Sequence, residues 1–223
     1  MQNKGYIPKG FGYLHRKGKA NSIDAGEVQI SDEHASAIAN SLSRAKYVNN
    51  LILKNVGLRD QQAIDIIKAM DRHVVRHLDI SYNPLLSIRF YMELCELLAD
   101  PSSHLERLEI EGNNIGDGML HELVQAMVKA KKLVYLNVSK NRIEDGGARD
   151  LALLIQEVPT LRLLFAHFNR IMGYGGVEIA EAMGGSKSLQ VLDLSFNSIC
   201  GSGKTRKKEE MTEEEEKKVE EKK

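Results

Sequence analysis

The stretch GSGKT, from Gly201 to Thr205, contains residue types that bind phosphate when they end a glycine-rich loop. The complete loop begins with a further glycine, which makes the turn that points successive backbone N–H groups at the phosphates. Ser198 occupies the position of that first glycine, so the motif is incomplete. The run LQVLDLS before it has the pattern of a strand, as such a loop requires. The neighbouring elements must therefore decide whether this is a nucleotide site.

The other candidates for chemistry are histidines and cysteines. His73 and His77 stand four residues apart in HVVRH, a spacing that would place both imidazoles on one face of a continuous helix. The repeat register described below instead places His77 on a strand and His73 in the connection before it, so we predict no metal site. Cys95 and Cys200 are the only cysteines, and reduced thiols are the expectation. With no Ser/His/Asp or Cys/His constellation, we predict no catalytic residues and no cofactor.

The composition indicates an ordinary water-soluble chain of one or two domains. Of its 223 residues, 42% are hydrophobic and 28% are charged, and the formal net charge is zero. No apolar run approaches the roughly 20 residues that span a bilayer. The N-terminal stretch lacks the apolar core of a secretory signal. We therefore expect a cytoplasmic protein without membrane contact.

Charge is distributed unevenly along the chain. Residues 1–20 hold five Lys or Arg and no acidic residue, and residues 201–223 hold eight charges of each sign. The remaining middle has 31 − 5 − 8 = 18 basic and 31 − 0 − 8 = 23 acidic residues, which argues against a nucleic-acid groove there. We define residues 1–19 as a basic aromatic arm and residues 201–223 as a charged low-complexity tail, either helical or disordered. The arm could contact an acidic neighbouring protein or cap the first repeat.

Internal repetition organises the rest of the chain. Four segments share the pattern Leu-x-x-Leu-x-apolar-x-x-Asn-x-Ile: LERLEIEGNNI from residue 105, LVYLNVSKNRI from 133, LRLLFAHFNRI from 161 and LQVLDLSFNSI from 189. Segments from residues 75, 48 and 20 keep the apolar positions. The first of these also keeps the asparagine, whereas the other two have Val56 and Val28 in its place. The seven starts are spaced by 28, 27, 30, 28, 28 and 28 residues.

Each unit predicts a strand followed by a helix. Apolar residues at the fourth and sixth positions alternate with polar ones, as a half-buried strand requires. The asparagine can then turn the chain inward, because its amide can bond to backbone groups that have left the strand ladder. In the following segment GDGMLHELVQAMVKA, Leu120, Leu123 and Met127 recur at helical spacing.

This pattern resembles the leucine-rich repeat family, and the 28-residue period is similar to its ribonuclease-inhibitor-like class. The resemblance covers residues 20–200, about seven repeats with the last one truncated. It implies an α/β solenoid in the form of a horseshoe arc, with parallel strands on the concave face and helices on the convex face. Stacked units would align five asparagines in a buried structural ladder: Asn83, Asn113, Asn141, Asn169 and Asn197.

The repeat register also answers the question raised by GSGKT. The strand before it is the last repeat strand, whereas a phosphate-binding loop belongs to a doubly wound sheet and leads into a well-packed helix. The segment that follows, RKKEEMTEEEEKKVEEKK, has only Met211 and Val219 as apolar residues. We therefore interpret Gly201, Ser202 and Gly203 as an exit from the solenoid and predict no nucleotide binding.

Binding is expected on the side chains that alternate with the core and face the concave surface. Acidic residues gather midway along it: Asp79, Glu109 and Glu111. An aromatic patch gathers toward its C-terminal end: Tyr135, Leu163, Phe165, Phe168, Val191 and Phe196. Aromatic residues are scarce, with seven Tyr, five Phe and no Trp, so this grouping predicts a partner-binding site. The alternative is that Phe168 and Phe196 tuck into the turn as part of the core.

These features predict a non-enzymatic protein–protein interaction scaffold within a multi-subunit complex. The basic arm and the open C-terminal edge near Leu192, Leu194 and Ile199 are expected to contact neighbouring proteins. The family resemblance implies subunits of cytoskeletal assemblies, including axonemal complexes of cilia and the actin-capping tropomodulins. The first alternative is a GTPase activator similar to the Ran-activating proteins, although this tail is charge-balanced where theirs is acidic. The second, a fragment of an innate-immune-type sensor, would lack the nucleotide-binding domain.

Overall fold

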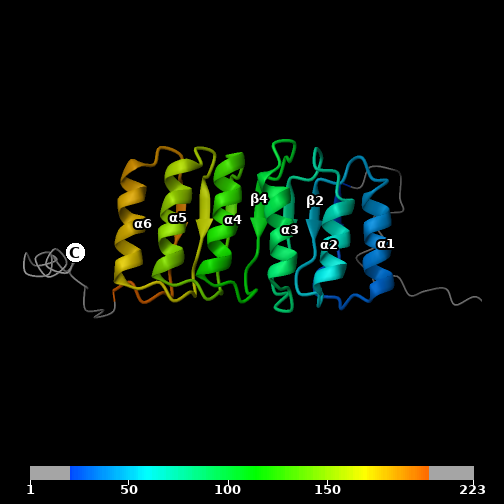
Figure 1. Ribbon diagram of the computed structural model, residues 1–223, viewed down its shortest axis with the longest axis horizontal. Coiled ribbons are helices and arrows are strands. Elements are labelled where there is room, and N and C mark those ends of the chain that lie inside the picture. The colour runs from blue at the N-terminus through cyan, green and yellow to red at the C-terminus, as the bar shows by residue number, and fades with distance from the viewer. Residues whose placement is uncertain (1–20, 201–223) are drawn as a thin grey trace, which may run out of the picture.

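The structure, a computed structural model, describes residues 21–200 as one solenoid of alternating strands and helices. Figure 1 shows the helices side by side in a layer in front of the strands, in the order of the sequence. The predicted α/β leucine-rich repeat solenoid is confirmed. The basic arm, the charged tail and the GSGKT motif lie outside the described residues.

The strands form one parallel sheet in sequence order, with one strand from each repeat. They are β1 (Ser22–Asp24), β2 (Asn50–Ile52), β3 (His77–Asp79), β4 (Arg107–Glu109), β5 (Tyr135–Asn137), β6 (Leu163–Phe165) and β7 (Val191–Asp193). The register pairs equivalent positions of successive repeats, as in the run Leu108, Leu136 and Leu164. Numbering positions from the first residue of each repeat therefore describes the spatial columns of the sheet, and each strand covers positions three to five.

The helices follow the strands as the repeat predicts. They are α1 (Asp32–Leu42), α2 (Asp60–Ala69), α3 (Ile88–Ala99), α4 (Asp117–Ala130), α5 (Asp145–Glu157) and α6 (Gly173–Gly185). Leu120, Leu123 and Met127 of α4 are buried, as their spacing indicated. Together with the fourth-position leucines of the strands, such residues form one continuous core between sheet and helices.

Several helices are capped by the helix before them. The Asp60 carboxylate of α2 accepts the backbone N–H of Ser87 at 2.7 Å, which lies at the start of α3. In the same way, Asp117 of α4 accepts from Glu144, and Asp145 of α5 accepts from Met172, each at 2.7 Å. These aspartates satisfy N–H groups that a helix start leaves without partners. Each one therefore couples the stability of two repeats.

The capping series is interrupted between α3 and α4. The first residue of α3 is Ile88, which is 65% exposed and has no polar group to offer. The N-cap residue of α4, Gly116, is a glycine and has no side chain that could cap the helix. Helices α3 and α4 therefore lack the aspartate-to-backbone hydrogen bond that joins α2 to α3 and α4 to α5.

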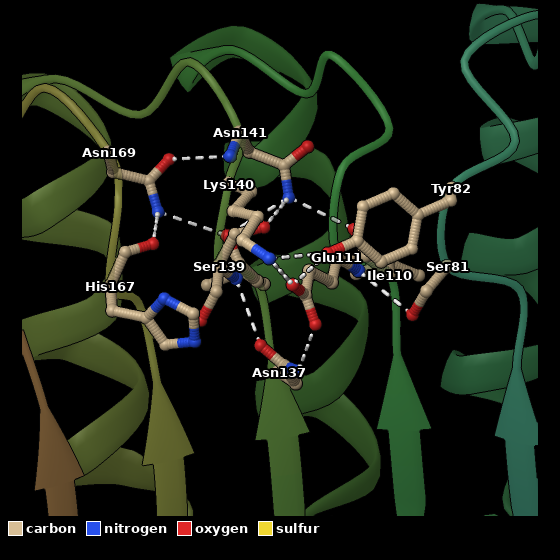
Figure 2. Close-up of polar contacts among 11 residues, drawn as sticks. Ser81, Tyr82, Ile110, Glu111, Asn137, Ser139, Lys140, Asn141, His167 and Asn169 are labelled. Carbon is tan, nitrogen blue, oxygen red and sulfur yellow. Dashed lines mark hydrogen bonds and ion pairs between the residues drawn. The ribbon is translucent and has the colours of Figure 1, made fainter.

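The asparagines lie in a hydrogen-bonded row just beyond the ends of the strands (Figure 2). Asn141 Oδ1 accepts the N–H groups of Asn113 and Ile115, each at 3.0 Å, and its amide nitrogen donates to the carbonyls of Ile110 and Val138 at 2.9 Å. Figure 2 shows the same arrangement continuing to Asn169. Each asparagine thus serves the backbone of two repeats. Asn83, Asn113, Asn141 and Asn169 are buried, and Asn197 in the last repeat is half-buried.

Candidate protein-binding surface

The strand exits follow a period of two repeats. In the odd-numbered repeats, the fifth-position side chain accepts the backbone N–H two residues later at 2.9 to 3.0 Å, and these acceptors are Asp24, Asp79, Asn137 and Asp193. The even-numbered repeats have Ile52, Glu109 and Phe165 at the same position. A short Asx side chain that folds back on its own turn leaves room for the longer side chains of the neighbouring repeats.

The seventh position alternates with the same period. The odd-numbered repeats have a small residue there, Gly26, Ser81, Ser139 or Ser195, and the even-numbered ones have Lys54, Glu111 or His167. Glu111 shows how the sizes fit together: its backbone N–H donates to the Ser81 hydroxyl at 3.2 Å, and its carboxylate accepts from the Asn137 amide at 3.2 Å. The alternation thus places large polar side chains between small neighbours.

The eighth position forms a row of left-handed residues, which we call the strand-exit row. Its φ angles all lie between 52° and 69°, and its members are Glu27, Asn55, Tyr82, Gly112, Lys140, Phe168 and Phe196. Bulky residues rarely adopt this backbone conformation, and such strain concentrates at functional sites. Phe168 and Phe196 do not join the core, because they are 46% and 70% exposed. Their rings stack with centroids 4.0 Å apart and planes 5° from parallel.

A polar cluster occupies the middle of this row. Lys140 Nζ lies 2.9 Å from Glu111 Oε1 and donates to the Tyr82 hydroxyl at 2.6 Å, and that hydroxyl also donates to Glu111 (Figure 2). Partial burial would raise the pKa of Glu111, but the bonds from Tyr82 and Lys140 bring it below its usual value. The bond to Tyr82 and then the bond to Glu111 raise the pKa of Lys140. All three side chains are held in place by one another.

Gly112 makes this cluster possible. It stands between Tyr82 and Lys140 in the strand-exit row, and a Cβ atom there would lie 2.8 Å from Cδ1 of the Tyr82 ring. Tyr82 therefore crosses the neighbouring repeat over a residue without a side chain. This close approach, together with a φ of 69°, explains the glycine.

A second cluster lies on the strands of the concave face. The Arg107 guanidinium lies 3.6 Å over the Tyr135 ring and bonds to Glu109 at 2.9 Å. His77 Nε2 lies 2.9 Å from the same carboxylate. Partial burial would raise the pKa of Glu109, but the bonds from His77 and Arg107 lower it overall. The Tyr135 ring in turn lies 5.3 Å from the Phe165 ring.

The structure separates the residues selected from the sequence into three groups. On the strands, Tyr135, Leu163 and Phe165 are half-buried side by side, and Val191 of the last strand is exposed. Phe168 and Phe196 stand on the strand-exit row beside them. Glu109 and Glu111 are half-buried and engaged by cationic side chains.

Asp79 corrects the expectation of an accessible acidic cluster. It is only 7% exposed, and its carboxylate accepts the Ser81 N–H within its own turn. Burial raises its pKa above the ordinary value. Conversely, sequence reasoning did not select Tyr82, Arg107 or Lys140. They stand in the same third- and eighth-position columns, and their alternation with acidic and aromatic neighbours was the available signal.

His73 and His77, which stand four residues apart in the sequence, lie in different local environments. His77 lies on β3, as the repeat register predicted, and His73 lies in the turn before it with its ring centroid 5.9 Å from that of His104. Between residues 21 and 200, no three His, Cys, Asp or Glu side chains are placed to share a metal ion. None of the helices in this range has the length and apolar character needed to cross a bilayer.

Comparison with known proteins agrees with this architecture. A family model described as "Leucine Rich repeat" matches residues 102–118 and 129–152, and a second, "Leucine Rich Repeat", matches residues 188–205. No curated protein sequence matches the chain.

Similar solved structures share the fold at low sequence identity. The tropomodulin C-terminal domain of Caenorhabditis elegans is 16% identical with a TM-score of 0.56, covering 67% of this chain and 91% of that one. The actin-binding site 2 of leiomodin-1 is 14% identical with a TM-score of 0.42, covering 75% of this chain and 79% of that one. At sequence identities this low, the likeness shows a shared fold and not a shared activity. Repeat pattern, family models and architecture agree that residues 21–200 form a leucine-rich repeat solenoid.

Proposed function

We propose that this protein is a non-enzymatic interaction scaffold whose aromatic patch binds another protein. The observation that carries the proposal is the exposed Phe168–Phe196 stack at the C-terminal end of the strand-exit row. Two rings held in parallel on strained backbone contribute nothing to the core of the solenoid. Burying such a ring against a partner contributes about 1.5–3 kcal/mol, so the pair is suited to be a binding hot spot.

The patch extends from this stack onto the strands. Tyr135, Phe165 and Leu163 form a half-buried apolar floor, and Val191 adds an exposed edge on β7. A concave floor with projecting aromatic side chains at one rim gives a partner both a complementary shape and apolar area to bury. The half-buried edge at Leu192, Leu194 and Ile199 continues the same surface toward the C-terminal end of the described residues.

We further propose that the partner belongs to a cytoskeletal assembly, with the axoneme of cilia as the finer suggestion. The basic arm and the charged tail suit a subunit embedded among neighbours. The fold likeness to the tropomodulin domain makes actin a reasonable first partner to test. Co-sedimentation of the full chain with actin filaments, and separately with axonemal microtubules, distinguishes the two assemblies.

The binding surface itself is tested with matched aromatic variants. Phe196→Ser removes an exposed ring of the patch, and Tyr47→Ser removes a ring of similar exposure, 64%, far from it along the chain. Quantitative crosslinking in native extract should show loss of the main partners for Phe196→Ser and retention for Tyr47→Ser. Circular dichroism would establish that both variants remain folded. Equal partner recovery for the two folded variants would remove the patch as the binding site.

A further inference from the structure

Helices α3 and α4 lie side by side (Figure 1), yet no side-chain hydrogen bond or ion pair joins them in the described part of the chain. The helices on either side are joined. α2 and α3 share the Lys68–Glu93 ion pair at 2.8 Å, and α4 and α5 share the His121–Asp150 pair at 2.8 Å. We call the unjoined boundary the α3–α4 seam, and its members are Ile88, Met92 and Glu96 of α3 and Glu122 of α4.

Counting from the N-cap of each helix shows which side chains face one another across the seam. The N-caps of α2, α3 and α4 are, in order, Arg59, Ser87 and Gly116. Lys68 stands nine residues after its N-cap (68 − 59 = 9) and pairs with Glu93, six residues after the next one (93 − 87 = 6). One helix further along, the same offsets belong to Glu96 (96 − 87 = 9) and Glu122 (122 − 116 = 6). Burial and then the charge of Glu122 raise the pKa of the Cys95 thiol of α3 to about 11, which agrees with a Glu122 side chain close to α3.

The seam therefore has two carboxylates where its neighbour has a cation and a carboxylate. Glu96 and Glu122 are both exposed, and no Lys, Arg or His between residues 21 and 200 pairs with either. Like charges on adjacent helices repel, whereas a cation placed between them would be attracted by both. The seam lacks one positive side chain.

The other half of the seam is apolar and exposed. Ile88 and Met92 stand four residues apart on one face of α3 and are 65% and 46% exposed. The third repeat adds to this surface because it is 30 residues long: Leu86 takes the core place before α3, and Leu85 is left 62% exposed. Apolar side chains that follow one helix face in this way indicate a surface that another segment covers.

We propose that the α3–α4 seam binds the basic aromatic arm of the same chain, with Tyr6 and Ile7 on the apolar half and a flanking lysine at the carboxylates. The arm has the required chemistry, because Lys4 and Lys9 stand on either side of these two apolar residues and residues 1–20 contain no acid. The charged tail does not have it. Its Met211 stands among glutamates, which the seam would repel.

The arm is long enough to reach the seam. Packed helices lie about 8–10 Å apart, so the seam is about 20–25 Å from α1, two and a half helix spacings along the layer. Lys9 precedes the first described residue by 21 − 9 = 12 residues, and a chain of that length extends to about 40 Å. The seam is on the helix side of the sheet and the aromatic patch on the strand side, so this inference does not depend on the proposed partner binding.

The test joins lysine to carboxylate in the full-length protein. An equal mixture of 15N-labelled and unlabelled chains is treated with a water-soluble carbodiimide, which couples a lysine amine to a carboxylate in direct contact, and the digested protein is analysed by mass spectrometry. We expect Lys4 or Lys9 coupled to Glu96 or Glu122, within chains of one isotope. Coupling mainly to Glu33 of α1 would overturn the proposal and indicate a cap on the first repeat. Coupling between labelled and unlabelled chains would overturn it in favour of a second copy.

A matched pair of methionine variants tests the apolar half of the seam. Met92→Ser removes a side chain of the seam, and Met183→Ser removes one of similar exposure, 44%, on α6. Coupling of the arm to Glu122 should fall about fivefold or more in Met92→Ser, because the contact loses much of its apolar area, and should be unchanged in Met183→Ser. Circular dichroism would establish that both variants are folded. Equal coupling in the two folded variants would overturn the seam as the site.

A second pair changes the arm and leaves every residue of the repeats intact. Tyr6→Ser removes an aromatic ring between the two lysines, and Tyr13→Ser makes the same exchange elsewhere in the arm. We expect Tyr6→Ser to lower the coupling to Glu96 and Glu122 and Tyr13→Ser to leave it unchanged. A yield that is the same for both would show that the arm reaches the carboxylates by charge alone, and the proposed apolar contact would be wrong.

Discussion

Replacing Gly112 with alanine tests whether one missing side chain organises the strand-exit row. Two costs are expected. Left-handed backbone costs a non-glycine residue about 1–2 kcal/mol, and Gly112 has a φ of 69°. The new Cβ would also lie 2.8 Å from Cδ1 and 3.0 Å from Cε1 of the Tyr82 ring, so the ring must move.

Moving the Tyr82 ring breaks its bonds to Lys140 and Glu111. These groups are only partly buried, so each lost bond costs about 0.5–1.5 kcal/mol. Adding the backbone cost to the two lost bonds gives a loss of about 2–5 kcal/mol in the free energy of unfolding. Urea denaturation followed by circular dichroism measures this loss.

A matched control and a double variant separate the two costs. Gly184→Ala lies in α6, where a new Cβ meets no atom within 4 Å, so alanine should stabilise that helix by about 0.5–1 kcal/mol. In a Tyr82→Ala background the clash at Gly112 is gone, and Gly112→Ala should cost only its backbone share. An equal cost with and without the Tyr82 ring would refute the claim that Gly112 exists to let the ring pass.

Three further perturbations test the links between repeats. Ile88→Asp supplies the absent capping carboxylate to α4 and should raise stability by about 0.5–1 kcal/mol in urea denaturation; a lower midpoint would contradict the capping series. Asn141→Ala leaves two buried N–H groups without an acceptor and should cost about 2–5 kcal/mol, whereas Asn197→Ala at the half-buried end should cost less, and equal losses would argue against the ladder. The hydrogen bond and then the charge of Asp150 raise the pKa of His121, so the pair stabilises the fold below the unfolded pKa of histidine and this contribution disappears as pH rises through the folded one. NMR titration should show the His121 pKa falling in Asp150→Asn, and an unchanged value would refute the link.

The sequence predicted the structural features that all repeats share. Leucine at the fourth position of each strand, helical spacing in segments such as the one containing Leu120, and asparagine at the turn specify local structure and burial together. Because all repeats stack through the same positions, one correct alignment yields the sheet order, the register and the layer of helices. The fold therefore followed from a single pattern.

The details of the surface did not follow, because they depend on contacts between repeats. Every eighth-position residue has a positive φ, whatever its side chain, so the residue type alone does not show whether the side chain packs into the core or faces solvent. Phe168 could therefore equally be expected in the core. Asp79 was selected as an exposed acid, yet its short side chain folds onto the Ser81 N–H. The alternation of Asx and long residues at the fifth position is present in the sequence, and aligning repeats two apart would have revealed it.

The aromatic stack follows from the backbone and not from attraction between the rings alone. Adjacent parallel strands lie about 4.7–4.9 Å apart, and residues with the same φ in consecutive repeats project their side chains in parallel. Phe168 and Phe196 have φ angles of 52° and 56°, which places their rings nearly parallel with centroids 4.0 Å apart. The asparagine row fixes the backbone that sets this spacing. A partner side chain that stacks on Phe196 would therefore extend an order that the solenoid has already established, at little further entropic cost.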